Sequence, residues 1–427
     1  MNRVQLLGRS LVGLILLFSV ACNDTDIITP PTPPQDFISQ TSPLTIEQSQ
    51  RLDGVYAVDQ GKEIFGDSVV IAQSGNRVTL YSGVKSGYVV FQAGSLDSVI
   101  LMVGYWKYQN SEQTGLAQAY IKREEGAAWI IGNGQGTAPT ERIIRLSIGE
   151  QNSAPSKPLR LRFVRPFSEK AQFDHENFYI IGHRCGGRMS DGIPASENTI
   201  ELALRAEELG CNSLEVDVRK SKDGVLYLYH DATINPRLIR KNTLVGATED
   251  YTWNVLQSEV TLLHGEKMPT LEDFLTAVVE KTEVKFVYLD TKTVGDGIIA
   301  DMVPIQKRAL ERAASLGRDI DIYIGIPNTD LLEELKTVQT TTGVVPSLIE
   351  TSPDDCIAVD GKVWSPRWSD GTQSSKVQEL QGQGRFAVTW TIDMPVYIQQ
   401  YLNEPTGRFN GFLTNYPMLV KYYILMQ

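Results

Sequence analysis

The sequence predicts an α/β protein in which a TIM-type (β/α)8 barrel follows a smaller all-β domain, either a sandwich or a barrel. Two observations indicate this class. Short apolar runs separated by Gly and Asn fill residues 51–168, whereas strand-like runs alternate with amphipathic helical stretches over residues 175–427. The first pattern is typical of antiparallel sheets, and the second of a parallel barrel surrounded by helices.

The composition is that of an ordinary globular protein. The 427 residues are 42% hydrophobic and 21% charged, which excludes disordered, collagen-like and coiled-coil chains. Lys and Arg number 40 against 51 Asp and Glu, for a net charge of -11. Such a chain gains nothing from counterion release, so we expect no nucleic-acid partner. A small phosphorylated substrate needs only a local cationic pocket, and the oligomeric state stays open.

The first segment, residues 1–21, is typical of a secretory signal. Arg3 and Arg9 precede an apolar run over 11–20, and small residues lead to Cys22. This ending resembles the lipobox of bacterial lipoproteins, in which the cysteine is lipidated. We therefore expect an extracytoplasmic protein, periplasmic or at the cell surface, held to a bacterial membrane by lipid only. The alternative, a buried apolar helix, is disfavoured by the prolines that follow.

Residues 22–50 are predicted to form a semi-extended tether, because prolines cluster there among Thr, Ser, Asp and Gln. Beyond the lipidation site the chain has three cysteines, Cys185, Cys211 and Cys356. An odd number without metal-ligand spacing is not a disulfide framework. At most one bridge is expected.

The β-rich domain is expected to be a structural or binding module. It has no histidine and no cysteine, so it offers no catalytic constellation. Prolines between residues 155 and 166 mark its end. The predicted strands are 68–71, 78–81, 88–91, 99–103, 117–121, 128–131, 143–148 and 159–164.

The barrel region offers nine strand-like runs where a (β/α)8 barrel needs eight. We expect one of the two near 344–366 to lie outside the barrel. A helix is predicted over 198–209, and Thr270 is a candidate N-cap for another. The candidate strands are 179–182, 214–218, 225–229, 286–289, 320–324, 344–349, 363–365, 386–391 and 411–413.

Two of the four histidines, His183 and His230, directly follow strand-like runs and each has a charged neighbour. The carboxyl ends of barrel strands form the active site. One such histidine alone would be interpreted as a core or loop residue. Two of them together indicate catalysis.

Carboxylates lie between and beyond the histidines. Alternation along a strand puts Glu215 and Asp217 on one face. Their repulsion is costly unless a cation joins them, and Ca²⁺ or Mg²⁺ is the natural partner of oxygen ligands. The alternative is a solvent-facing strand edge. Asp290 offers a third carboxylate, while Lys292 and Arg184 suit phosphate oxygens. No Ser-His-Asp or Cys-His setting accompanies them, so the set favours phosphoester chemistry over acyl transfer.

These motifs and others resemble the glycerophosphodiester phosphodiesterase family, in order and at family-like spacing, over about residues 178–422. The residues that carry the resemblance are His183-Arg184, Glu197-Asn198-Thr199, Glu215-Val216-Asp217-Val218, Lys222-Asp223-Gly224, His230-Asp231, Pro269-Thr270-Leu271-Glu272, Asp290-Thr291-Lys292, Trp390-Thr391 and Gly411-Phe412-Leu413-Thr414-Asn415-Tyr416-Pro417. The β-rich domain is outside the resemblance.

The resemblance implies a TIM-type barrel with a small insertion, about residues 232–268. It also implies metal-dependent hydrolysis of glycerophosphodiesters to glycerol 3-phosphate and an alcohol, with one divalent ion. The implied roles are acid and base for His183 and His230, metal ligation for Glu215, Asp217 and Asp290, phosphate contact for Arg184 and Lys292, and metal or polar support for Glu197.

The chain departs from the family pattern at four places. Asp290 stands where Glu is usual, so this ligand is one methylene shorter. Cys185 replaces a Gly, Ala195-Ser196 replaces a Pro, and Asn415 stands where Asp is common. No core catalytic group is lost, but the fit of the substrate is less well defined.

The expected mechanism is in-line displacement at phosphorus. One histidine deprotonates the nucleophile, either the glycerol 2-hydroxyl or water, and the other protonates the leaving alcohol. Which histidine takes which role stays open. Trp390, and with less support Trp364 and Trp368, are expected to wall the pocket.

Two rival functions remain. A phospholipase C- or D-like phosphodiesterase acting on lipids or lysolipids would need an apolar groove, which the insertion would supply. A surface lipoprotein that binds a ligand without catalysis would leave the barrel inactive.

Overall fold

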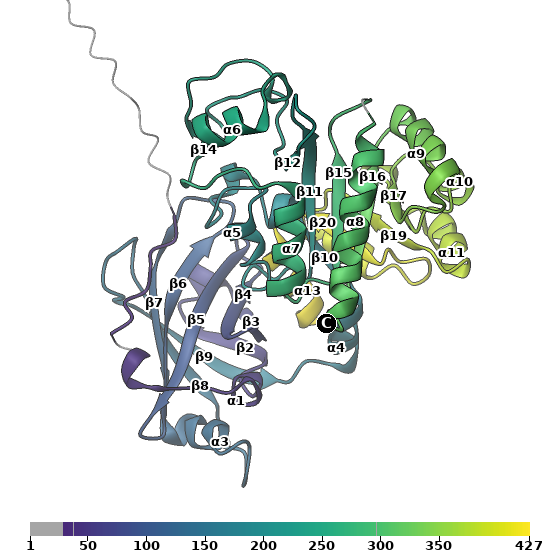
Figure 1. The fold of residues 1–427 in the computed structure, drawn as a ribbon. Coiled ribbons are helices and arrows are strands. Elements are labelled where there is room, and N and C mark those ends of the chain that lie inside the picture. Colours follow the sequence, from purple (N-terminus) through teal and green to yellow (C-terminus); the bar gives the residue numbers. More distant parts are fainter. Residues whose placement is uncertain (1–28, 37, 296) are drawn as a thin grey trace, which may run out of the picture.

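The computed structural model describes residues 29–36, 38–295 and 297–427. The predicted signal segment 1–21 and the lipidation residue Cys22 lie outside the described residues. Figure 1 shows two barrels side by side, an antiparallel one in purple to blue and a parallel one in teal to yellow.

The antiparallel part is a closed barrel rather than a sandwich. Each strand pairs with the next one in the chain, and the last strand pairs back with the first. Inward-facing side chains, among them Tyr56, Phe91 and Trp106, form one buried cluster. The strands are β2 (Gly54–Gln60), β3 (Ser68–Ser74), β4 (Arg77–Ser82), β5 (Gly87–Leu96), β6 (Val99–Tyr108), β7 (Thr114–Ile121), β8 (Ile143–Ile148) and β9 (Lys157–Arg165).

One predicted strand of this barrel, 128–131, is wrong, because the segment is helix α3 (Ala127–Ile131). Ala127 and Ile130 are its buried residues, a spacing of three that fits one face of a helix. A short apolar run does not distinguish helix from strand by periodicity alone.

The end of the segment predicted as a tether contains regular structure. Strand β1 (Ser42–Pro43) pairs with β5. Helix α1 (Ile46–Gln50) follows, with Thr45 and Gln48 forming a capping box. A short 3-10 turn, η1 (Ile38–Gln40), precedes both. The described elements therefore begin within the region 22–50.

The second part is a closed ring of eight parallel strands, as predicted, because β20 pairs back with β10. Its interior is filled by a buried cluster that includes Phe286, Tyr323 and Leu348. The strands are β10 (Tyr179–Gly182), β11 (Ser213–Lys220), β15 (Phe286–Thr291), β16 (Asp321–Ile326), β17 (Ser347–Ile349), β18 (Val363–Trp364), β19 (Phe386–Thr389) and β20 (Gly411–Thr414).

Helices cover the outside of this ring, and α4 (Glu169–Asn177) precedes its first strand. Thr270 caps α7 as predicted, since its side chain accepts a hydrogen bond from the backbone of Asp273. The helix predicted over 198–209 is much shorter than expected. The remaining helices are α5 (Ile200–Ala203), α7 (Leu271–Lys281), α8 (Ile298–Ser315), α9 (Thr329–Thr342), α10 (Pro353–Ala358), α11 (Ser374–Gly382), α12 (Pro395–Leu402) and α13 (Pro417–Met426).

The prediction of the surplus strand is also wrong. Both strands near 344–366 belong to the barrel, and the one outside is β12 (Leu226–Leu228), which pairs antiparallel with β11. The turn at Lys222-Asp223-Gly224 is too short for a crossover, so it can join only antiparallel strands. The hairpin carries the chain back along β11, and the backbone of Tyr229 donates a 3.0 Å hydrogen bond to the carbonyl of Asp217.

The insertion 232–268 forms a small unit of its own at the top of Figure 1. It contains the two-stranded pair β13 (Ile239–Lys241) and β14 (Thr261–Leu262), a turn η5 (Thr248–Asp250) and helix α6 (Trp253–Glu259). Several of its apolar side chains, among them Leu256, Val260 and Leu262, are buried in the barrel's core cluster. Within the described residues, no helix combines the length and apolar character that a bilayer crossing requires.

Besides the two barrel interiors, one hydrophobic cluster spans both barrels. Outward-facing side chains of the antiparallel barrel, such as Val70, Tyr81 and Val90, belong to the same buried cluster as Leu209 and Met418 of the parallel barrel. Helix α13 packs against β3 and β4. Fully burying a side chain of this size stabilises a fold by about 1.5–3 kcal/mol, so the two barrels stabilise each other.

A buried lysine lies at this junction. Lys421 is 6% exposed, and its Nζ donates a 2.8 Å hydrogen bond to Nδ1 of His175 on α4. The charge of Lys421, followed by burial, lowers the pKa of His175 from 6.5 to about 3. The imidazole is therefore neutral at physiological pH.

This pair predicts acid-sensitive stability. Between pH 6.5 and 3 the unfolded chain binds a proton at His175 that the folded chain does not, so the free energy of unfolding falls as the pH falls through this window. His175→Gln keeps an acceptor for Lys421 but cannot be protonated. Denaturant unfolding should show that this variant loses about 2 kcal/mol less than wild type between pH 6.5 and 4.5. Equal losses in wild type, His175→Gln and the control Gln172→Ala on the same helix would contradict the assignment.

Candidate active site

A cavity of about 460 Å³ opens at the carboxyl ends of the parallel strands. This is where barrel enzymes bind their substrates. The lining residues are His183, Arg184, Glu215, His230, Tyr288, Asp290, Thr291, Lys292, Val294, Pro327, Asn328, Glu350, Arg367, Trp390, Thr391 and Leu413.

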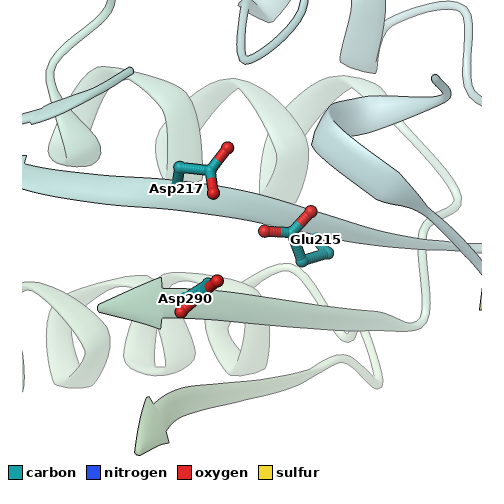
Figure 2. A group of neighbouring side chains, drawn as sticks. All are labelled: Glu215, Asp217 and Asp290. Atoms are coloured by element: carbon teal, nitrogen blue, oxygen red, sulfur yellow. The ribbon is translucent and has the colours of Figure 1, made fainter. Parts of the chain in front are cut away.

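Three predicted carboxylates meet beside this cavity. Glu215 and Asp217 lie on β11, and Asp290 lies on the neighbouring strand β15, directly opposite Asp217 in register. One oxygen from each lies within 4.8 Å of the others. Figure 2 shows the three carboxylates gathered in one place, two on one strand and one on the next. Alternation along one strand and pairing to the next produce this cluster.

Hydrogen bonds hold two of these carboxylates in place. Oε2 of Glu215 accepts a 2.8 Å bond from the backbone N–H of Arg184. Nδ2 of Asn198 donates a 2.6 Å bond to Oδ2 of Asp217, and Oδ1 of Asn198 accepts a 3.0 Å bond from the backbone of Asp217. Asn198 does this from the left-handed region, with φ 60°, which asparagine tolerates better than most residues. The sequence motif contained Asn198 but gave it no role.

Lys292 lies between Asp217 and Asp290. Its Nζ is 3.0 Å from Oδ1 of Asp217 and also bonds Oδ2 of Asp290. Lys292 lines the cavity, and its partners in this structure are carboxylates. The predicted contact with the substrate phosphate stays a prediction. The lysine thus offsets part of the negative charge.

The electrostatics of the cluster favour a cation. Burial and the charges of Asp217 and Asp290 raise the pKa of Glu215 well above its usual range. Burial also raises the pKa of Asp290, against the effect of Lys292. At Asp217 burial acts in the same direction, but the charges of Lys292 and His230 prevail and lower the pKa to about 2. The three carboxylates therefore cannot all ionise at low cost unless more positive charge is present.

The residues present fit a hard divalent ion. All three ligand side chains offer oxygen, which Ca²⁺ and Mg²⁺ prefer. Oδ1 of Asp290 is buried and accepts no hydrogen bond from the described residues, so it has a lone pair available for a metal. A fully buried carboxylate oxygen without a donor is costly otherwise.

Arg184 is fixed by Glu197. Its guanidinium donates a 2.7 Å bond to Oε1 of Glu197, and both side chains are buried. Glu197 also accepts a 2.7 Å bond from the backbone of Met189 and two longer ones from Arg237. Of the two predicted alternatives for Glu197, metal ligation or polar support, these contacts favour polar support.

His183 is oriented by a chain of two residues. Its Nδ1 is 2.7 Å from Oδ1 of Asn415, whose Nδ2 donates a 2.6 Å bond to Asp393. Because Asn415 presents oxygen, Nδ1 of His183 carries the proton, and its Nε2 lies 3.8 Å from Glu215. Burial and the charge of Arg184 lower the pKa of His183 to about 3. Sequence reasoning noted Asn415 only as a departure from the family and missed Asp393.

His230 has a carboxylate partner instead. Its Nδ1 lies 2.6 Å from Oδ1 of Asp231. Asp231 is held by Arg237 at 2.6 Å and by Asn235 at 2.8 Å. His230 follows the antiparallel strand β12. It is therefore the hairpin, and not the end of a parallel strand, that brings His230 to the cavity.

Tyr288, Glu350 and Arg367 also line the cavity. The hydroxyl of Tyr288 donates a hydrogen bond to Glu350, and the guanidinium of Arg367 lies 4.8 Å from the ring centre of Trp390. Burial, followed by the charge of Asp290, raises the pKa of Glu350 to about 7. Sequence reasoning missed Tyr288, Glu350 and Arg367, although the last two directly follow strands or lie close after them.

Of the three predicted tryptophans, Trp390 lines the cavity and bonds the carbonyl of Ser365 through Nε1 at 2.9 Å. Trp364 is buried, and Trp368 packs on Tyr397. Neither is among the cavity residues.

A closed (β/α)8 barrel with histidine, acidic and basic side chains around a cavity at the carboxyl ends of its strands has the architecture of a TIM-barrel enzyme. The chain belongs to the glycerophosphoryl diester phosphodiesterase family. Residues 183–418, more than half of the chain, match the sequence profile of that family.

The chain is also similar to individual members. A glycerophosphodiester phosphodiesterase of Caldanaerobacter subterraneus is 32% identical over 108 residues, which are 24% of this chain and 41% of that protein. The chain spans less than half the length of the curated relatives it matches.

Two solved structures are similar to part of this chain. A glycerophosphodiester phosphodiesterase of Parabacteroides distasonis has a TM-score of 0.46 and 21% identity, over 58% of this chain and 97% of that one. A phosphodiesterase of Oleispira antarctica, solved with the product sn-glycerol-3-phosphate, has a TM-score of 0.45 and 17% identity, over 58% and 96%.

The carboxylate cluster predicts metal-dependent stability. Ca²⁺ or Mg²⁺ at about 100 times its dissociation constant should raise the free energy of unfolding by about 2.7 kcal/mol, measured by denaturant unfolding with and without EDTA. Asp217→Asn should remove most of this increment because it removes a ligand charge. The control Glu272→Gln, an exposed acid on α7, should keep it. An equal increment in both variants would place the ion elsewhere.

Proposed function

We propose that the protein hydrolyses glycerophosphodiesters to glycerol 3-phosphate and an alcohol. One observation carries the proposal: His183 and His230, each anchored through Nδ1, border the same cavity as Glu215, Asp290 and Arg184. Within the described residues neither histidine makes a hydrogen bond through Nε2, and two such nitrogens suit the two proton transfers of a phosphodiester displacement. Membership of the family supports the same reaction.

Charged and polar groups among the cavity residues support a small polar diester as the substrate. Arg184 and Lys292 offer positive charge to the phosphate, and Glu350, Arg367 and Asn328 offer polar groups to the glycerol and alcohol portions. The insertion 232–268, expected to supply an apolar groove for a lipid, contributes none of the described cavity residues. A phospholipase-like activity therefore has less support.

Glu215, Asp217 and Asp290 would hold one divalent ion, Ca²⁺ or Mg²⁺. When bound, the ion supplies positive charge that neutralises the nonbridging oxygens of the phosphate. Arg184 adds to this effect from a position that Glu197 fixes. Such preorganised charge acts in the transition state without the cost of reorienting the groups.

The hydrogen-bond partners of the two histidines suggest different roles. Nδ1 of His230 lies 2.6 Å from a carboxylate oxygen, Oδ1 of Asp231, and this contact fixes the ring in a position from which Nε2 can give a proton. Asn415 offers His183 only an amide oxygen, which keeps the proton on Nδ1 and leaves Nε2 as an acceptor. We infer that His183 accepts the proton of the attacking hydroxyl or water as the phosphorus–oxygen bond forms. His230 gives its proton to the alcohol oxygen as the other bond breaks.

If the glycerol 2-hydroxyl attacks, the first product is a cyclic phosphate. Water then opens the ring with the two histidines in reversed roles, which returns each proton to its starting place. Attack by water gives the final products in one step. Trapping of a cyclic phosphate would separate the two routes.

The test measures glycerol 3-phosphate released from glycerophosphocholine with Ca²⁺, Mg²⁺ or EDTA. His183→Ala and His230→Ala should each lower kcat by about 10² to 10⁴. A glycerol phosphodiester of p-nitrophenol needs no acid, because its leaving group is stable as an anion. On this substrate, measured as p-nitrophenolate released, His230→Ala should recover most of its rate and His183→Ala should not.

His264→Ala is the matched control, because this histidine is not among the cavity residues. It should keep wild-type kcat on both substrates. Recovery by His183→Ala instead of His230→Ala would reverse the two roles. If wild type releases no glycerol 3-phosphate with any metal, the proposed reaction is refuted. Preferential cleavage of a lysophospholipid would favour the phospholipase-like activity.

We further propose that the enzyme acts outside the cytoplasm, anchored through lipid on Cys22. Support comes from the basic, apolar and small-residue order of residues 1–22. The mass of the intact mature protein tests this, since lipidation predicts a chain that starts at Cys22 with acyl groups attached. A mature chain that retains residues 1–21 would contradict it.

A further inference from the structure

Gln109 of the antiparallel barrel reaches the backbone beside the active site. This residue follows β6 directly and is 2% exposed. Its Nε2 donates two hydrogen bonds into the parallel barrel, one of 3.0 Å to the carbonyl of Gly186 and one of 2.6 Å to the carbonyl of Asn415. Both bonds cross from one barrel to the other.

The two carbonyls flank His183. The backbone N–H groups of Gly186 and Gly187 both donate to the carbonyl of His183, at 3.0 and 2.7 Å, so Gly186 closes the turn that carries this histidine. Asn415 is the residue whose side chain bonds Nδ1 of the same ring. The side-chain amide of Gln109 thus bonds both the turn that carries His183 and the backbone of Asn415, the residue that orients the His183 ring.

The local sequence is fitted to this contact. Gly187 has φ +147°, and a Cβ there would lie 3.3 Å from Nε2 of Gln109 and 2.9 Å from Ile193. Both partners of Gln109 are carbonyl oxygens, so its NH2 end must face them. Its Oε1 is buried and accepts no hydrogen bond from the described residues, so burying this side chain is favourable only through the bonds that Nε2 donates.

The end of the hairpin that presents Gln109 is held firmly. Lys107, fully buried, donates a 2.7 Å bond to the carbonyl of Ser111 across the turn. The backbone of Tyr108 donates a 3.0 Å bond to the carbonyl of Gln113. A rigid donor can fix the position of its acceptors, whereas a mobile one would follow them.

We propose that Gln109 is a positioning residue of the active site, and that the antiparallel barrel sets the orientation of His183 through it. The inference rests on the proposed hydrolysis for its kinetic test. Displacement of a catalytic group by about 1 Å can cost up to about 10²-fold in rate. Loss of the Gln109 bonds should therefore lower kcat by about tenfold and leave KM nearly unchanged, because Gln109 is not among the residues that line the cavity.

The test compares wild type, Gln109→Met and Gln118→Met in kcat and KM for glycerophosphocholine. Methionine matches glutamine in length but donates no hydrogen bond. Gln118 lies on β7 of the same barrel and is half-buried, so its variant controls for the substitution itself. A thermal unfolding scan of each variant separates loss of fold from loss of rate.

A second readout does not depend on turnover. The chain has four histidines, so ring-labelled histidine gives an interpretable NMR spectrum. Wild type should show His183, assigned through His183→Ala, with the proton on Nδ1. Gln109→Met should shift His183 toward the other tautomer and leave His264 unchanged. If Gln109→Met does not fold, Gln109→Asn, which withdraws the amide by one methylene, should give the same change in smaller degree.

The outcomes separate the two claims. A folded Gln109→Met with wild-type kcat and an unchanged His183 signal would overturn the positioning role, as would an equal loss of kcat in Gln118→Met. If wild type hydrolyses no diester, the proposed function fails, and the His183 tautomer alone then decides the role of Gln109.

Discussion

The mutual repulsion of three clustered carboxylates, two of them buried, is the constraint on which the rest of the site depends. Glu215, Asp217 and Asp290 are held together by strand pairing, not by attraction. Isolated negative charges in a buried site are costly, and they persist only with positive charge and hydrogen bonds around them. Lys292, the backbone N–H of Arg184 and the amide of Asn198 meet that requirement in part. A divalent ion would complete it.

The need of each buried charge for an opposite charge continues beyond the three carboxylates, through a series of alternating basic and acidic side chains. Arg184 is fixed by Glu197, Glu197 by Arg237, and Arg237 also bonds Asp231, the partner of His230. The two ends of the site are therefore linked through one polar network, in which each member needs the next to be satisfied. Removing one member leaves a buried group without its partner, which usually costs more than the bond itself contributes.

Sequence reasoning succeeded where a local rule was sufficient. Alternation along one strand put Glu215 and Asp217 on one face, and repeated strand–helix units gave the barrel. It failed where the structure depends on the direction of a strand or on pairing between strands far apart in the sequence. The short turn before β12 reverses the chain. The predictions of which strand lies outside the barrel, and of His230 at the end of a parallel strand, were therefore wrong. The bond between His183 and Asn415 joins residues 232 apart, and it exists only because β20 closes on β10. No spacing rule in the sequence reports such a pair.

The contribution of the antiparallel barrel was hidden from sequence for a related reason. Residues that touch a phosphate or a metal must have particular chemistry, so they form recognisable motifs. A residue that holds a backbone carbonyl needs only a donor at the correct place, and Gln109 in a strand-rich region has no such motif around it. Its effect depends on a contact between residues 306 apart and on the core that the two barrels share. Burial of that core fixes the hairpin relative to His183, so packing between the barrels is itself part of how the active site keeps its geometry.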